Sequence, residues 1–295
     1  MSGHSKWATI KHKKGALDAK RGKLFTKLIK ELTVAARMGG GDPGGNPRLR
    51  RAVSDAKGQQ MPNDTITRAI KRGTGEIEGE AFEEVIYEGT GPGGTLFMVD
   101  GMTDNRNRTV AELRKIFERN NGVLGQSGTA NWAFDRKGVI TLAKDAVTED
   151  QLMDLAVGAG ADDYAIVDDA WQVQTPIESL DAVGKALEGA KLTLKSSNLQ
   201  FLPKTKKQVS GRDAELCLQL AEMLDDHDDV QNVFADFDVS DEEMARIAAL
   251  PLRPVRRAGT GWGSRRDAPS RIFRVRRRAG RRQTILRYDA RWAFV

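Results

Sequence analysis

Residues Tyr87–Asp100 read YEGTGPGGTLFMVD, and this stretch decides what kind of fold the surrounding chain can form. Gly89, Gly91 and Gly94 match the G-x-G-x-x-G spacing of dinucleotide-binding loops. In such a loop the glycines open a helix, because the pyrophosphate binds at the helix N-terminus. Here Gly94 leads into TLFMVDGMT, which is rich in residues that favour strands. The stretch is therefore predicted to be a flexible hairpin connection between two strands, and not a cofactor site.

The elements around the hairpin predict an α+β sandwich. Strands at 82–88 and 94–102 flank the glycines, and TDNRNRTVAELRKIFERNNG then gives a capped helix with Leu113 and Phe117 facing inward. The stretch TANWAFDR, residues 129–136, is predicted to be a further strand of this unit. A helix and a strand within 205–238 are too few to form a domain alone, so they are expected to complete the same sandwich.

The segment between these two parts has its own pattern. Residues 138–203 predict the order strand, helix, strand, strand, helix, strand, which is the split unit of ferredoxin-like folds. We therefore expect a domain at 137–203 to be inserted into a discontinuous middle domain at 79–136 and 204–245.

The chain before the hairpin is predicted to be helical. Leu24, Leu28 and Leu32 recur at helical spacing, and MGGGDPGGNP then stops that helix. A second helix follows from about Arg48, and a third lies between Pro62 and a stop signal at Gly73. The fold class is thus α+β: an N-terminal three-helix domain at 1–78 plus two ferredoxin-like α/β sandwich domains, one inserted in the other.

The net charge of +6 hides three unlike parts. Residues 1–77 carry 17 Lys or Arg against 6 Asp or Glu, and residues 78–250 carry 16 against 33. Residues 251–295 carry 14 Arg, no Lys and 2 Asp. We call residues 1–77 the basic head and residues 78–250 the acidic body. This contrast indicates that the basic head contacts a polyanion such as nucleic acid or the ribosome.

The basic head supplies the candidate nucleic-acid contacts, since phosphates bind clustered Lys and Arg and bases stack on Trp. This set comprises His4, Lys6, Trp7, Lys11, His12, Lys13, Lys14, Lys20, Arg21, Lys23, Lys27, Arg48 and Arg50. Three further cations, Arg68, Lys71 and Arg72, close the third helix and belong to the same surface. No helix-turn-helix recognition helix stands out, which weakens the case for sequence-specific DNA reading.

Other polar and sulfur-containing groups have ordinary structural interpretations. The stretch LDDHDDV, 224–230, lacks the glycine and distant glutamate of a calcium loop and is predicted to be a solvated helix end. Cys217 is expected to be a small core residue, and Trp132 and Trp171 are expected to be core residues on strands. With three histidines and one cysteine, we predict no catalytic, cofactor-binding or metal site.

Targeting signals are not evident in this sequence. It has no apolar run long enough to span a membrane, and its basic start lacks the apolar region of a signal peptide. A single cysteine fits a reducing compartment, so we expect a cytoplasmic protein with no membrane partner. The oligomeric state is left open.

Residues 250–295 form an arginine-rich tail that is predicted to be disordered on its own. Residues 1–250 use 19 Lys and 14 Arg, whereas the tail uses only Arg. Two hypotheses explain this change: a lineage-specific basic arm, or an out-of-frame reading of a GC-rich gene, which the abruptness of the change favours. An intact mass of native protein that matches all 295 residues would exclude the second hypothesis.

Several long motifs resemble the YebC family, to which the mitochondrial translational activator of cytochrome oxidase belongs. They are GHSKWATIKHKKG, AKRGKLFTKLIKELTVAAR, GGGDPGGNPRLR, MPNDTITRAIKRGTG, YEGTGPGG and TDNRNRTV, and the likeness runs from Met1 to about Glu243. The resemblance implies a three-domain, non-enzymatic, cytoplasmic protein. By the match of motifs, Arg106 and Arg108 of the TDNRNRT loop join the candidate contacts, as donors beside a helix N-terminus.

Two functions follow from the resemblance, and the sequence supports them equally. Family members are described as probable DNA-binding transcriptional regulators, and others act on the ribosome to relieve stalling at proline-rich stretches. The basic head fits either partner, DNA or ribosomal RNA, because phosphate contact is blind to sequence. The acidic body favours one-sided contact and is expected to meet basic ribosomal proteins if the ribosome is the partner. An enzyme that uses the glycine loop is the weakest hypothesis.

Overall fold

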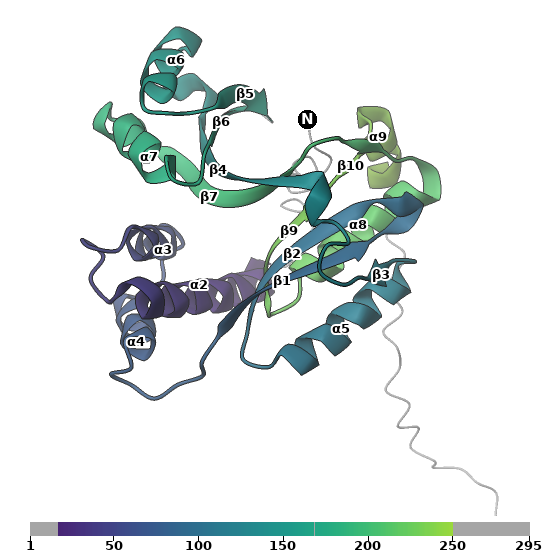
Figure 1. Ribbon diagram of the computed structural model, residues 1–295, viewed down its shortest axis with the longest axis horizontal. Coiled ribbons are helices and arrows are strands. Elements are labelled where there is room, and N and C mark those ends of the chain that lie inside the picture. The colour runs from purple at the N-terminus through teal and green to yellow at the C-terminus, as the bar shows by residue number, and fades with distance from the viewer. Residues whose placement is uncertain (1–16, 168, 250–295) are drawn as a thin grey trace, which may run out of the picture. The chain divides into compact units, whose positions relative to one another are not determined.

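The computed structural model describes residues 17–167 and 169–249, with side chains from residue 21 to residue 248 (Figure 1). Several predicted features lie outside these residues: the arginine-rich tail, the side chain of Lys20, and His4, Lys6, Trp7, Lys11, His12, Lys13 and Lys14. Their predicted roles stay predictions.

Three helices form the N-terminal part, as predicted: α2 (Leu17–Gly39), α3 (Pro47–Gly58) and α4 (Asn63–Gly73). Their shared core contains Leu32, Leu49 and Ile66, all nearly fully buried. Asn46 fixes the start of α3, because its side-chain oxygen accepts a hydrogen bond from the Leu49 N–H at 3.1 Å. Gly40 follows α2 with a φ of 85°, a conformation that glycine adopts without strain.

Gly73 lets α4 approach α2 closely. A methyl group at Gly73 would collide with the Thr33 carbonyl oxygen and lie 2.7 Å from Cβ of Ala36. We expect Gly73→Ala to lower the free energy of unfolding by about 1–3 kcal/mol, because α4 must move away from α2. Gly22→Ala, in an open part of α2, is the control and should raise it by up to about 1 kcal/mol. Urea unfolding measures both changes, and equal effects would contradict the close contact.

The glycine stretch forms the hairpin that the sequence predicts. Strand β1 (Glu83–Thr90) pairs antiparallel with β2 (Leu96–Thr103) along its whole length. The chain turns through a short 3₁₀ segment, Pro92–Gly94, in which Gly93 and Gly94 have φ values of 65° and 71°. Because the last glycine is followed by a strand and not by a helix, the loop lacks the helix N-terminus that a dinucleotide needs.

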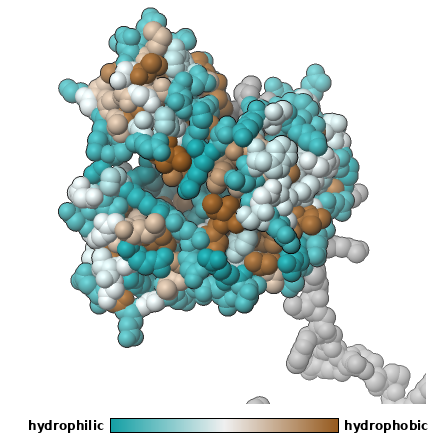
Figure 2. All heavy atoms as spheres, viewed as in Figure 1, coloured by the Kyte–Doolittle hydropathy of each residue, from teal (hydrophilic) through white to brown (hydrophobic). Residues whose placement is uncertain are grey.

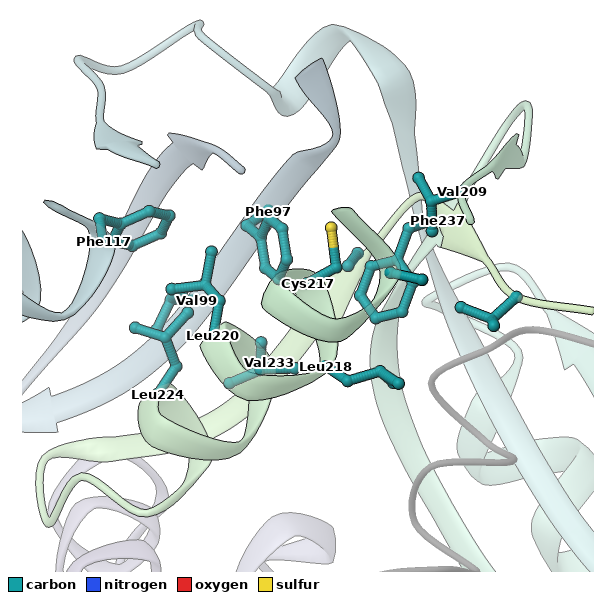
Figure 3. Close-up of a cluster of buried hydrophobic side chains, with 14 of the residues drawn as sticks. Phe97, Val99, Phe117, Val209, Cys217, Leu218, Leu220, Leu224, Val233 and Phe237 are labelled. Carbon is teal, nitrogen blue, oxygen red and sulfur yellow. The ribbon is translucent and has the colours of Figure 1, made fainter. Parts of the chain in front are cut away.

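The hairpin belongs to a four-stranded antiparallel sheet in the order β3-β1-β2-β9, with β3 at Val123–Leu124 and β9 at Val230–Ala235. Helices α5 (Arg106–Arg119) and α8 (Gly211–Asp225) pack on one face of this sheet. Phe97 lies at the centre of that core, between the rings of Phe117 and Phe237 (Figure 3). Strand β8 (Lys207–Gln208), which precedes α8, pairs in parallel with β10 (Phe237–Asp238), and α9 (Asp241–Ala249) follows β10.

A second four-stranded sheet has the ferredoxin-like order β5-β6-β4-β7, with every neighbouring pair antiparallel. Its elements are β4 (Phe134–Ala143), α6 (Glu149–Gly158), β5 (Asp163–Val167), β6 (Ala170–Thr175), α7 (Leu180–Gly189) and β7 (Leu194–Pro203). Ile140, Trp171 and Leu187 contribute to its core, so the expectation for Trp171 is confirmed. The limits 1–78, 79–136 with 204–245, and 137–203 stay a prediction for the domains, although β4 of the second sheet already begins at Phe134.

The predicted strand at 129–136 is wrong over residues 129–133, and only its last three residues lie in a strand. Asn131–Ala133 form a 3₁₀ turn, and strand β4 begins only at Phe134 and belongs to the second sheet. The cause is the buried carboxylate of Glu88, which accepts hydrogen bonds from the backbone N–H groups of Gly128, Ala130 and Asn131 at 3.0, 2.6 and 2.9 Å. Three N–H groups converging on one carboxylate bend the backbone away from an extended form. Trp132 is consequently 68% exposed and not a core residue.

Candidate nucleic-acid interface

One face of α2 is directed at the loop that follows α8. Lys23 donates to the backbone oxygen of Asp226 at 2.8 Å, and Lys27 pairs with the Asp225 carboxylate at 3.0 Å. Lys30, one turn further along, reaches the Asp229 carboxylate at 2.6 Å. Sequence reasoning assigned Lys23 and Lys27 to nucleic acid, but the structure directs both ammonium groups at the protein's own acidic loop.

Asp229 is the centre of a buried polar cluster, which we call the Asp229 cluster and which also contains Lys30, Thr103, Arg108 and Thr109. Oδ1 of Asp229 accepts from Lys30, while Oδ2 accepts from Arg108 at 2.8 Å, from Thr109 at 2.7 Å and from Thr103 at 3.3 Å. Asp229 and Lys30 are only 3% and 6% exposed. The cluster joins α2 to the start of α5 through one carboxylate.

The electrostatics of the cluster stabilise the ionised form of Asp229. Burial acts to raise the pKa of this carboxyl group, but hydrogen bonds from Lys30, Arg108 and Thr109 outweigh it. The pKa of Asp229 therefore lies far below its ordinary value. The pKa of Arg108 is raised by its hydrogen bonds to Asp104 and Asp229, so both partners remain charged at neutral pH.

The prediction of a solvated helix end for LDDHDDV is wrong at Asp229. The residues that bury Asp229 are distant in sequence, since Lys30 lies 199 positions before it and Arg108 lies 121 positions before it. Single-sequence patterns carry no signal for such a pairing. A lysine on the inner side of an amphipathic helix was the available hint, because a buried Lys needs a carboxylate partner.

A pocket of about 570 Å³ opens beside the Asp229 cluster. His227 lies in its wall, with Nε2 2.8 Å from a Glu112 oxygen, while its Nδ1 accepts from the Asp229 N–H at 3.1 Å. The pocket is lined by Lys23, Lys30, Glu80, Phe82, Asp104, Arg108, Glu112, Asp226, His227, Asp228 and Asp229. Carboxylates outnumber cations in this lining, so the pocket disfavours phosphate.

Four other predicted contacts also have partners within the protein. Arg48 binds Glu31 at 2.7 Å and Glu84 at 2.5 Å, and although burial acts to lower its pKa, these bonds raise it above its ordinary value. The remaining pairs are Arg50 with Asp181 at 3.4 Å, Arg106 with Glu83 at 2.5 Å, and Arg108 with Asp104 at 2.6 Å. Phosphate must compete with a carboxylate at each of these cations. Arg21 instead lies over the Phe25 ring, 5.4 Å from its centroid.

Helix α4 presents a group of cations with few partners inside the protein. Arg68, Lys71 and Arg72, which we call the α4 basic face, follow the i, i+3, i+4 spacing of neighbours on one helix surface, and all are exposed. Within the described residues, Arg68 and Arg72 form no ion pair, and Lys71 lies 3.9 Å from Glu76. Arg68 and Arg72 can therefore meet a polyanion without giving up an ion pair with another described residue.

The arrangement of α3 and α4 gives the α4 basic face a defined support. Only residues 59–62 separate the two helices, and both pack against α2. Helix-turn-helix units also join two helices by a short turn, and in them the second helix faces the duplex. Sequence reasoning did not single out α4, because its basic residues were merged with the charge of the whole head.

Metal-ligand groups, the single cysteine and the helix lengths can each be checked in the described residues. Between residues 17 and 249, apart from 168, no three or more His, Cys, Asp or Glu side chains are grouped to hold a metal ion. Burial raises the pKa of the Cys217 thiol to about 11, so this core cysteine is a poor nucleophile at neutral pH. None of the helices in this part of the chain is long and apolar enough to cross a membrane.

Comparison with known proteins places most of the chain in one family. A family profile described as the TACO1/YebC protein N-terminal domain matches residues 5–76, and one described as the TACO1/YebC second and third domain matches residues 82–237. A probable transcriptional regulatory protein of Geobacter sulfurreducens is 54% identical over 247 residues, and one of Desulfotalea psychrophila is 55% identical over 249 residues. Each match covers 84% of this chain and 100% of the relative.

The fold has a counterpart among crystal structures. A conserved hypothetical protein of Aquifex aeolicus superposes with a TM-score of 0.73 at 44% sequence identity, over 80% of this chain and 97% of that one. The α+β layout of N-terminal helices followed by antiparallel sheets is thus shared with a solved relative. On these sequence and structural matches, the chain belongs to the TACO1/YebC family.

Proposed function

We propose that this protein is a non-enzymatic, cytoplasmic regulator of gene expression that binds DNA through its helical N-terminal part. The α4 basic face carries the proposal, because Arg68 and Arg72 form no ion pair within the described residues and stand on the second helix of a helix-turn-helix-like pair. Phosphate contacts by such cations supply most non-specific affinity for DNA. The relatives' name, probable transcriptional regulatory protein, supports the same assignment.

The remaining predicted contacts differ in whether they must break an ion pair within the protein before they can bind phosphate. His4, Lys6, Trp7, Lys11, His12, Lys13 and Lys14 precede α2 and stay in the proposed contact set. Lys27, Arg48, Arg50, Arg106 and Arg108 contribute less, because each already binds a carboxylate. The proposed contact surface is therefore the α4 basic face together with the segment before α2.

Reversing two charges of the α4 basic face tests the proposal. Arg68→Glu with Arg72→Glu is expected to weaken binding to a duplex at least about tenfold at fixed salt. It should also reduce the salt slope of log K by about 2, close to one for each lost phosphate contact. Fluorescence anisotropy with a labelled duplex, measured over a series of salt concentrations, gives both quantities.

The matched control places the same charge change on α5. Arg114→Glu with Arg119→Glu alters two exposed arginines for which the structure shows no carboxylate partner within the described residues, so duplex affinity should change little. Equal losses in the two double variants would reduce the effect to net charge and remove the α4 basic face from the proposal. Comparison of a specific promoter fragment with random DNA then separates sequence reading from phosphate binding.

A ribosome- or RNA-binding translation factor that relieves stalling at proline-rich stretches is the second candidate. The observation in its favour is the acidic body, since 33 acidic against 16 basic residues over 78–250 repel nucleic acid but attract basic proteins. Co-sedimentation with ribosomes, beside duplex binding at the same salt, separates the candidates. Ribosome association without promoter preference would favour the translation factor, and the reverse would favour the transcriptional regulator.

A further inference from the structure

The surface formed by α6 and β5 combines three features that point to a protein partner. We call it the α6–β5 surface and define it by Glu149, Asp150, Met153, Asp154, Val157 and Ile166. It lies on the second sheet unit, whereas the α4 basic face belongs to the N-terminal helices. Its occupant is therefore argued independently of the proposed nucleic-acid contact.

The first feature is an open strand edge. In the order β5-β6-β4-β7, strand β5 lies at the end of the sheet and pairs only with β6 among the described strands. The pairing with β6 covers all of Asp163–Val167, so β5 is a regular strand along its whole length. A regular edge presents backbone N–H and C=O groups that a further extended chain can pair with.

The second feature is a group of exposed apolar side chains. Met153 and Val157 are 43% and 51% exposed and lie four residues apart on α6, while Leu152 and Ala156 occupy its core face. Ile166 on β5 is 46% exposed, although it pairs with the buried Trp171. Hydrophobic side chains lie among hydrophilic ones over the part of the molecule that contains α6 (Figure 2).

The third feature is charge. The segment from Lys144 to Asp169 contains eight Asp or Glu and a single Lys. That lysine pairs with Asp169 at 4.0 Å, and Asp162 pairs with Lys137 at 3.0 Å. Within the described residues, Glu149, Asp150 and Asp154 form no ion pair, and they lie on the same helix as the exposed Met153 and Val157. A negative rim repels nucleic acid and attracts a Lys- or Arg-rich partner.

We propose that the α6–β5 surface binds an extended, Lys- or Arg-rich segment of another protein, which adds as a strand to β5. Backbone pairing with Asp163–Val167 would hold the segment, and alternate apolar side chains would cover Met153, Val157 and Ile166. The basic side chains between them would meet the acidic rim. An extended nucleic acid would share none of the backbone pairing and would be repelled by the rim, so a basic protein segment is the occupant.

The test uses the full chain and a fluorescein-labelled peptide in which Lys alternates with Val. Asp150→Lys with Asp154→Lys is expected to weaken binding of this peptide by at least about tenfold, because attraction becomes repulsion. Met153→Ser with Val157→Ser should weaken it by about three- to tenfold through lost apolar contact. Both pairs of side chains are exposed, so the fold should persist, and circular dichroism checks this.

Two controls make the outcome decisive. Glu78→Lys with Glu118→Lys makes the same change of net charge on exposed positions elsewhere and should leave peptide affinity within about twofold. A peptide with Glu in place of Lys should not bind. Equal weakening by the control pair, or equal binding of both peptides, would overturn the proposed surface.

Amide hydrogen exchange tests strand addition directly. Saturating Lys–Val peptide should slow exchange of the Asp163–Val167 amides, because the outward N–H groups of an edge strand gain partners. Slower exchange there, lost in the Asp150→Lys, Asp154→Lys variant, supports the proposal. Peptide binding without any change at β5 would overturn it.

Discussion

Asp229→Ala is expected to lower the free energy of unfolding by roughly 3–5 kcal/mol, as is usual when one partner of a buried ion pair is removed. The variant leaves the Lys30 ammonium buried without its carboxylate, and the hydroxyls of Thr103 and Thr109 lose an acceptor. Urea unfolding followed by far-ultraviolet circular dichroism measures the change. Hydrogen exchange should place the largest loss of protection at α2 and at the start of α5, which the cluster joins.

Asp228→Ala is the matched control, one position away. Its side chain is exposed, and its contribution to the cluster is a backbone oxygen that accepts from Lys30 at 2.9 Å. Because alanine keeps that oxygen, stability should change by less than about 0.5 kcal/mol. Similar losses in the two variants would mean that Asp229 has no special role.

The Asp229 cluster also predicts a pH dependence. The pKa of Asp229 is lowered in the folded chain, so the unfolded chain binds this proton more readily. Its stabilisation is complete above the unfolded pKa of about 3.9 and is lost as the pH falls towards the folded value. The stability difference between the parent chain and Asp229→Ala should therefore shrink as the pH falls from about 5. A difference that grew on acidification would have the wrong sign.

Phe97→Ala is expected to lower the free energy of unfolding by about 3–5 kcal/mol through loss of core packing. The ring is fully buried and lies edge-on to Phe117, with centroids 6.1 Å apart, and tilted against Phe237 at 5.8 Å (Figure 3). Gly91 approaches it so closely that a methyl group there would lie 2.7 Å from Oγ1 of Thr95 and against the Phe97 ring. The cavity that Phe97→Ala leaves cannot close unless the hairpin around Gly91 moves. We therefore expect the surrounding core to relax only a little into the cavity.

Ile86→Ala provides the comparison for Phe97. Ile86 lies on the adjacent strand β1 and is 48% exposed, so truncation should cost less than about 1 kcal/mol. Urea unfolding of both variants gives the two values under one protocol. Losses of equal size would show that the sheet face covered by α5 and α8 is not the main core of this part of the chain.

Much of this fold was predictable because its signals are local. The glycines of Tyr87–Asp100 are followed by a run of strand-forming residues, and local propensity alone separates a hairpin from a dinucleotide loop. The stop signals after α2 and at Gly73 likewise delimit the three helices. The 3₁₀ turn that replaces the first part of the predicted strand at 129–136 has no local signal in the sequence. The Glu88 carboxylate that bends this backbone lies 42 positions before Ala130 and 43 before Asn131.

For the candidate interface, too, some properties follow from the sequence alone and others only from the folded structure. The charge imbalance between residues 1–77 and 78–250 is a property of composition, so the sequence by itself determined that one part of the chain suits a polyanion. It also determined the family, through long motifs that need no structure. Which cations are available to that polyanion was decided only by the tertiary structure. Lys27, Lys30, Arg48 and Arg108 meet carboxylates from distant parts of the chain, whereas Arg68 and Arg72 meet none among the described residues. The reason is physical: charge type is encoded residue by residue, but burial and ion pairing depend on which residues folding brings within a few ångströms.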